Sequence, residues 1–236
     1  AVGVLAGGSG CRVATLGLLE SGVASGDGLG LRYDMGGKVV AVTVDGRELP
    51  AGFARFVVPG GFYLRQPGQA DPTEILGRVW RDGDRMNFAA APAGLEMSAA
   101  FEPKADRIEV TGRVRNPAGD ARGVTIGFSL PVDAGGWAFG RSINRSERIT
   151  TADVYAEWTC ADSDWDGRQI NRGMITPIYS EAVGLALGAV SDHPQVFRVC
   201  YRRGLGFAIE MDLGLSPLPA KFRNEATFKF IIYRFN

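Results

Sequence analysis

The feature that most constrains this chain is the alternation of apolar and polar residues, which recurs along most of its length. Between residues 107 and 115, for example, the even positions are apolar or glycine, and the odd positions are charged or threonine. A period of two is that of a β-strand with one buried face, because successive side chains of a strand point to opposite sides. No convincing run has the spacing of a helix. The sequence therefore predicts strands almost throughout.

Turn residues separate these strands at intervals of about 8 to 12 residues, a spacing typical of sandwiches and barrels. Segments rich in Gly, Asp, Asn or Pro predict tight connections between paired strands at 35–37, 45–46, 82–84 and 116–120. The last of these would join 107–115 to 124–130 as an antiparallel hairpin. We expect an all-β fold, a large antiparallel β-sandwich of the supersandwich kind, with about 12 to 16 strands.

The hairpin around Arg203 allows its register to be predicted. A three-residue loop that ends at Gly204 places a set of apolar residues on one face, pairing Phe197, Val199 and Tyr201 with Ile209, Phe207 and Leu205. A two-residue loop would move every side chain to the opposite face, so the three-residue loop is preferred. The other face then carries Arg198, Cys200, Gly206, Ala208, Glu210 and Asp212.

No linker poor in apolar residues and no clear internal repeat interrupts the chain, so we expect residues 1–236 to form a single β-sandwich domain. Residues 1–28 are rich in Gly, Ala and Val and are interpreted as an N-terminal strand or arm. The apolar segment 226–235 predicts a strong final strand, either paired inside a sheet or offered to a neighbouring molecule.

Charge excludes several kinds of partner. Lys and Arg together number 26, as do Asp and Glu, so the formal net charge is zero. Nucleic acids and anionic membranes need a surplus of positive charge, and no apolar run is long enough to span a bilayer, so we expect neither nucleic-acid binding nor membrane insertion. The first residue is Ala1, which fits a processed N-terminus and an extracellular or secreted protein.

An acidic segment resembles the first half of a calcium loop. Asp162, Asp164 and Asp166 alternate, as the carboxylates that converge on calcium do. The twelfth position of the loop is Gly173 rather than the glutamate of an EF-hand, so the segment is not an EF-hand. It is either a calcium loop with a different closing ligand or a solvated acidic loop that nearby arginines neutralise. No other cofactor is expected.

Glu210 and Asp212 are the candidates for catalysis. They stand two apart on one strand face, about 7 Å between Cα atoms, a separation that suits a pair of glycosidase carboxylates. The stronger interpretation is structural, because Arg198 lies diagonal to Glu210 on the paired strand and would form a salt bridge with it. His193 is the only histidine, which excludes any mechanism that needs a histidine pair.

Trp137, Trp158 and Trp165 are the candidates for glycan binding. They fall in irregular segments, where sites usually lie, and an aromatic ring suits the apolar face of a pyranose. Trp80 lies in an alternating strand and is interpreted as structural.

Strand-like passages recur at 28–33, 44–50, 60–65, 184–188, 195–201 and 228–235. Together they resemble the amino-terminal β-sandwich module of uncharacterised bacterial proteins related to glycoside hydrolases, which is similar to the galactose-mutarotase supersandwich. The resemblance implies a module that precedes a catalytic domain. It also implies that a true mutarotase would use two histidines and a glutamate, whereas this chain has one histidine. The resemblance therefore assigns a catalytic role to no residue of this chain.

Three functions follow from these observations. The first is a non-catalytic module of a secreted carbohydrate-active system, which binds or scaffolds a glycan through loop aromatic residues. The second is a self-assembling structural subunit of an extracellular filament or sheath, whose partners would be copies of itself. The third, ranked last, is a carboxylate-dependent glycosidase or epimerase working through Glu210.

Overall fold

The structure is a computed structural model, and it describes residues 21–51, 60–69, 71–142, 144–150, 154–158 and 174–235. These residues form 19 strands and one short 3-10 turn, η1 (Pro92–Gly94). The prediction of an all-β fold is confirmed. The strands outnumber the expected 12 to 16 partly because β4 and β6 have only two residues each, too few to show alternation. In the described part of the chain, no helix is long and apolar enough to cross a membrane.

The strands pair antiparallel in three sheets. The four-stranded sheet has the order β1 (Ser21–Ala24), β2 (Leu29–Tyr33), β3 (Val39–Val44), β4 (Arg47–Glu48). The nine-stranded sheet has the order β13 (Arg145–Arg148), β12 (Ala138–Ser142), β15 (Ile175–Tyr179), β16 (Gly184–Ala189), β19 (Glu225–Phe235), β10 (Ile108–Arg115), β9 (Glu96–Pro103), β8 (Arg85–Ala90), β7 (Arg78–Asp82). The six-stranded sheet has the order β14 (Val154–Trp158), β17 (Phe197–Arg202), β18 (Gly206–Leu215), β11 (Arg122–Leu130), β5 (Gly61–Arg65), β6 (Thr73–Glu74).

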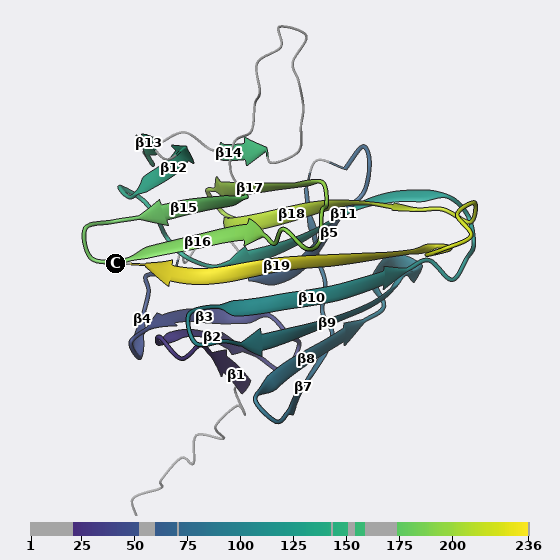
Figure 1. Ribbon diagram of the computed structural model, residues 1–236, viewed down its shortest axis with the longest axis horizontal. Helices are drawn as coiled ribbons and strands as arrows, with labels where there is room; N and C mark the ends of the chain where they lie inside the picture. The colour runs from purple at the N-terminus through teal and green to yellow at the C-terminus, as the bar shows by residue number, and fades with distance from the viewer. Residues whose placement is uncertain are drawn as a thin grey trace, which may run out of the picture.

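The two larger sheets pack face to face and form a sandwich (Figure 1). Phe62 on β5 reaches across to the nine-stranded sheet, where its ring centroid lies 5.1 Å from that of Phe88, 5.8 Å from Phe101 and 5.9 Å from Phe228. Phe128, on the neighbouring strand β11, lies 4.9 Å from the same ring in an edge-on arrangement. All five side chains are buried. The inner faces of the alternating strands therefore meet in one aromatic core.

Three of the four predicted connections are confirmed as turns between paired strands, namely β2–β3, β3–β4 and β7–β8. The fourth prediction is wrong: β10 pairs with β9 and β19, whereas β11 pairs with β5 and β18 in the other sheet. Val114 and Val124 are nevertheless both buried in the shared core. Two consecutive strands show the same alternation whether they pair within one sheet or pack face to face from two sheets. The alternation alone therefore does not distinguish these cases.

The predicted register of the β17–β18 hairpin is also wrong, by two residues. Tyr201 pairs with Phe207, and the loop consists of residues 203–205, with Gly204 in its middle. Leu205, the expected partner of Tyr201, instead packs beside Cys200 on the outer side of the sheet. A shift of two residues preserves the faces, so apart from Leu205 the apolar side chains of this hairpin point into the core as predicted.

The final strand β19 lies inside the nine-stranded sheet, between β10 and β16 (Figure 1). Its Arg234 also forms ion pairs with Asp45 (2.5 Å) and Asp27 (3.7 Å), which belong to the turns of the four-stranded sheet. The strand is thus not offered to a neighbour, and this argument for self-assembly no longer holds. At the other end, β1 falls within the predicted arm 1–28, and residues 1–20 lie outside the described residues. That the chain forms a single domain stays a prediction.

The core packing gives a testable prediction. We expect Phe62→Ala to lower the free energy of unfolding by about 3–5 kcal/mol, because it leaves a cavity between the sheets. Urea denaturation followed by circular dichroism measures this. The control is Leu218→Ala, whose side chain is 89% exposed, with an expected change below about 0.5 kcal/mol. Equal losses in the two variants would contradict the assignment of Phe62 to the core.

Candidate functional site

Glu210 lies on β18, on the face of the six-stranded sheet that points away from the aromatic core. Its neighbours Ile209 and Met211 are buried in the core, so alternation directs Glu210 and Asp212 to the opposite side. The register places one residue of each strand in a single row across the sheet: Trp158, Arg198, Glu210, Gly127, Tyr63 and Glu74. Arg198 is therefore directly opposite Glu210, rather than diagonal to it as the sequence predicted.

Both carboxylate oxygens of Glu210 are engaged. Oε1 accepts hydrogen bonds from the Tyr63 hydroxyl at 2.8 Å and from Nη2 of Arg65 at 2.9 Å. Oε2 accepts a hydrogen bond from Nε of Arg198. The Glu210 side chain has no exposed surface, whereas the two arginine side chains retain 19% and 13%. A buried carboxylate is stable only when paired in this way, so Glu210 anchors the two guanidinium groups.

Gly127 explains how Tyr63 reaches Glu210 from two strands away. It stands between them in the row, and the Tyr63 ring lies directly over it. A Cβ atom at position 127 would overlap that ring. Burial, together with the nearby Cys200 and Glu210, raises the pKa of the Tyr63 hydroxyl, which therefore keeps its proton and donates it to the hydrogen bond.

Asp212 extends the network toward solvent. Its Oδ2 lies 3.4 Å from Nη1 of Arg198, and its Oδ1 accepts a hydrogen bond from the Thr125 hydroxyl at 2.6 Å. Burial lowers the pKa of Arg198, but the charges of Glu210 and Asp212 and the hydrogen bond to Glu210 outweigh that effect, so the net shift is upward. The Asp212 side chain is 40% exposed. Two arginines and two carboxylates thus form a network without net charge, and Asp212 is its most accessible carboxylate.

A groove lies beside this network and is lined by residues of β5, β11 and β18 and of the loop that follows β5. Its volume is about 460 Å³. The polar side chains among its lining residues are Arg65, Gln66, Gln69, Thr125 and Asp212. They supply amide, guanidinium, hydroxyl and carboxylate groups, a set that can donate hydrogen bonds to a polar ligand and accept them from it.

Cys200 lies under the same network, packed with Tyr63, Leu205 and Ala208. Burial, with a smaller contribution from the charge of Glu210, raises the pKa of its thiol to about 12. The thiol is therefore protonated at neutral pH and is not a nucleophile.

The structure brings only some of the predicted site residues together. The backbone of Trp158 pairs with that of Arg198, in the same row as Glu210, but its side chain is not described. Trp137 is partly buried against the aromatic core, far less open than predicted. Trp165 and the acidic segment Asp162, Asp164 and Asp166 lie outside the described residues. Within the described ranges, no group of three or more His, Cys, Asp or Glu residues could hold a metal ion.

His193 and Trp80 lie elsewhere. The ring nitrogen Nε2 of His193 is 3.2 Å from the carbonyl oxygen of Thr227, on the nine-stranded sheet, so the histidine is not part of the Glu210 network. Trp80 is 40% exposed on the outside of the nine-stranded sheet, which corrects the interpretation that it is structural.

Tyr63 and Arg65 were not predicted as partners of Glu210. The only signal for them is the alternation in 61–65, which places both on the face opposite Phe62 and Leu64. Nothing in the sequence indicates that β5 joins the sheet next to β11.

No protein-family model and no curated protein matches this chain. Among solved structures, it is similar to a protein from Synechocystis sp. PCC 6803 (11% identity, TM-score 0.53, 92% of this chain and 95% of that one) and to a galactose mutarotase-like protein from Lactobacillus casei (11%, 0.50, 92% and 100%). It is also similar to an alpha-galactosidase from Lactobacillus brevis (10%, 0.51), of which it spans 39% of the length. The chain therefore has the fold of galactose mutarotase-like proteins.

The buried network leads to a stability prediction. We expect Glu210→Gln to lower the free energy of unfolding by about 3–5 kcal/mol, because it leaves two guanidinium groups without their buried counter-charge. Urea denaturation checks this. Glu102→Gln is the matched control, since Glu102 pairs with Arg85 and Lys104 at the surface, where a pair contributes at most about 1 kcal/mol. A loss as small as that of the control would show that Glu210 does not hold the network.

Cys200 gives a second prediction. It is tested in a variant that carries Cys11→Ser and Cys160→Ser, so that Cys200 is the one remaining cysteine. A thiol reagent should label the native protein at pH 8 only as fast as the protein unfolds, because the thiol is buried and protonated. The raised pKa stabilises the folded state at pH values below the ordinary thiol pKa, and this contribution is lost as the pH rises toward 12. Rapid labelling of the native protein at pH 8 would contradict the assignment.

Proposed function

We propose that this protein is a non-catalytic carbohydrate-binding module, which holds a neutral saccharide over the outer face of β5, β11 and β18. The supporting observation is that two carboxylates on one strand have different environments. Glu210 is buried and anchors the arginines, while Asp212 is exposed at the groove. As expected from the sequence, such a module would act outside the cell in a carbohydrate-active system.

The groove chemistry favours a saccharide as the ligand. Saccharide hydroxyl groups both donate and accept hydrogen bonds, and Asp212, Thr125 and Arg65 offer both functions within one groove. The charges of the network cancel, so the site has no excess of either sign with which to attract an ion.

Binding without catalysis is supported by the state of Glu210. A glycosidase needs one carboxylate to donate a proton and another to act as base or nucleophile, both in reach of the ligand. Both oxygens of Glu210 are occupied by protein donors, and none of its side-chain surface is exposed. His193, the only histidine, lies between β16 and β17, where its ring contacts Thr227 of the other large sheet.

The fold offers a weaker argument by analogy. Two of the similar structures have names that refer to galactose or to a galactosidase. Function depends on the site rather than on the fold, so the contacts of Asp212 carry the proposal and the likeness only suggests which sugars to test first.

A saccharide array followed by isothermal titration calorimetry tests the proposal. The native protein should bind at least one neutral saccharide, and Asp212→Ala should weaken that binding by about tenfold or more, equivalent to about 1.4 kcal/mol. Asp84→Ala, at an exposed position in the β7–β8 turn, is the control and should leave the affinity unchanged.

Two outcomes would overturn this proposal. Failure to bind any saccharide on the array would contradict the proposed binding function. Turnover of a bound saccharide that is lost in Glu210→Gln, while the variant remains folded by circular dichroism, would show that the protein is an enzyme.

A further inference from the structure

The outer face of the nine-stranded sheet carries an exposed tryptophan that the proposed function does not use. Trp80 stands in the middle of β7, and the register aligns it with Asn87, Ala100 and Thr111 on the next three strands. Arg78, on the same face of β7, lies over its ring with the guanidinium carbon 5.7 Å from the centroid. A cation in this position attracts the ring, and Trp80 is 40% exposed, so it presents an aromatic surface to solvent.

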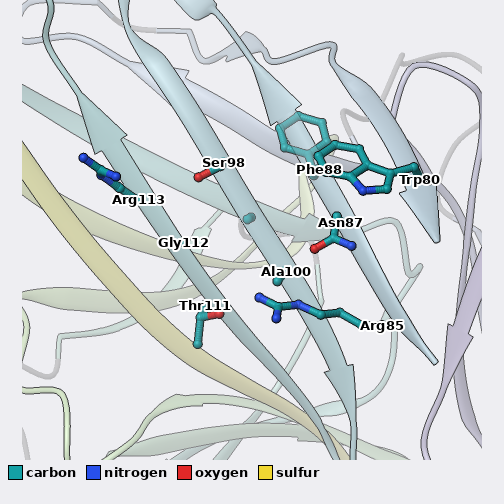
Figure 2. A pocket seen from close by; sticks show the side chains of 10 residues that line it. Trp80, Arg85, Asn87, Phe88, Ser98, Ala100, Thr111, Gly112 and Arg113 are labelled. Atoms are coloured by element: carbon teal, nitrogen blue, oxygen red, sulfur yellow. The ribbon is translucent and has the colours of Figure 1, made fainter. Parts of the chain in front are cut away.

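A hollow of about 290 Å³ opens beside Trp80. Figure 2 shows its lining residues on four neighbouring strands, with Trp80 and Asn87 at one side and Thr111 and Arg113 at the other. Ala100 forms part of its surface, and its small side chain leaves the space between the longer side chains open. The volume is close to the lower end of known ligand pockets, which suits one small ring.

Three polar side chains in this hollow have no hydrogen-bond partner among the residues that the structure describes. Asn87, Ser98 and Thr111 line it, and no hydrogen bond to their side chains is found within the described part of the chain. An amide and two hydroxyl groups can together donate and accept several hydrogen bonds. An aromatic face beside free hydroxyl and amide groups fits a pyranose, which has an apolar face and a polar edge.

The charges around the hollow favour a neutral ligand. Its charged lining residues are Arg85 and Arg113, and each is already paired outside the hollow. Arg85 lies 3.5 Å from Glu102, and Arg113 is bonded to Glu225. Each guanidinium therefore already has a carboxylate partner, which weakens its attraction for an anionic ligand.

The hollow continues along the sheet. A second hollow shares Ser98 and Arg113 with it and extends to Glu96, at the start of β9. From Glu96 to Ala100 the strand rises by about 13 Å, which is longer than one sugar ring. The two hollows are thus adjacent along the sheet, and their combined length suits several linked rings rather than a single ring.

We propose that these two adjacent hollows, with Trp80 at one side, form a second saccharide site that binds a neutral oligosaccharide chain by stacking one ring on Trp80. It is separate from the Asp212 groove, which lies on the outer face of the other large sheet. The two sites would let one module hold two chains or two parts of a branched chain.

Calorimetric titration with four defined probes tests this inference: cellohexaose, maltohexaose, xylohexaose and, as the anionic comparison, hexagalacturonic acid. At least one neutral hexasaccharide should bind the native protein. Trp80→Ala should weaken that binding by about tenfold or more, and Asn87→Ala by roughly threefold, the size expected for one lost hydrogen bond. Leu218→Ala, at another highly exposed position, should leave it unchanged. Circular dichroism confirms that each variant is folded.

The variants separate this site from the proposed function. Loss of binding in Trp80→Ala with full binding in Asp212→Ala supports the second site. Loss in Asp212→Ala alone overturns the second site and leaves the proposed function intact. The inference is also overturned if none of the three neutral probes binds, if hexagalacturonic acid binds more tightly than all of them, or if the matching monosaccharide binds as tightly as the hexasaccharide.

Discussion

The packing of Phe62 between the two large sheets is the contact on which the rest of the structure depends. Burying one apolar face of each strand in a shared core forces the other face outward, toward solvent. Glu210 can therefore stand next to Ile209 and Met211 in sequence and still belong to a polar surface. The sandwich thus presents two broad outer faces, one on each large sheet, and both sites that we propose lie on these faces.

The two outer faces of the sandwich differ in how their charged and polar side chains are arranged. On the six-stranded sheet, the charges are drawn together around the buried carboxylate of Glu210, so the network is rigid and electrically balanced. On the nine-stranded sheet, Arg85 and Arg113 pair with Glu102 and Glu225, and small residues lie between them and Trp80 on the edge strand β7. The first arrangement fixes donors in place, whereas the second leaves room for a ring.

The sequence predicted the fold class and the core-facing residues well, because alternation reports directly on which side of a strand is buried. It did not predict the pairing of β10, since a turn shows that the chain reverses but not which strand it then joins. The sequence identified Glu210 as a candidate site residue because it is a charged residue in a mostly apolar strand. Its partners Tyr63 and Arg65 were missed because they lie about 145 residues away, and only the order of strands in the sheet brings them close.

The position of β19 has a consequence for how the protein folds during synthesis. This strand links β7, β8, β9 and β10 to β12, β13, β15 and β16, so the nine-stranded sheet is incomplete until β19 is in place. Until then β10 and β16 each expose an unpaired edge, a state that invites wrong association between nascent chains. Arg234 also forms its pairs with Asp27 and Asp45 only at that moment, which couples the earliest part of the sheet structure to the latest. Completion of the nine-stranded sheet therefore requires β19 to pair with strands from two separate stretches of the chain.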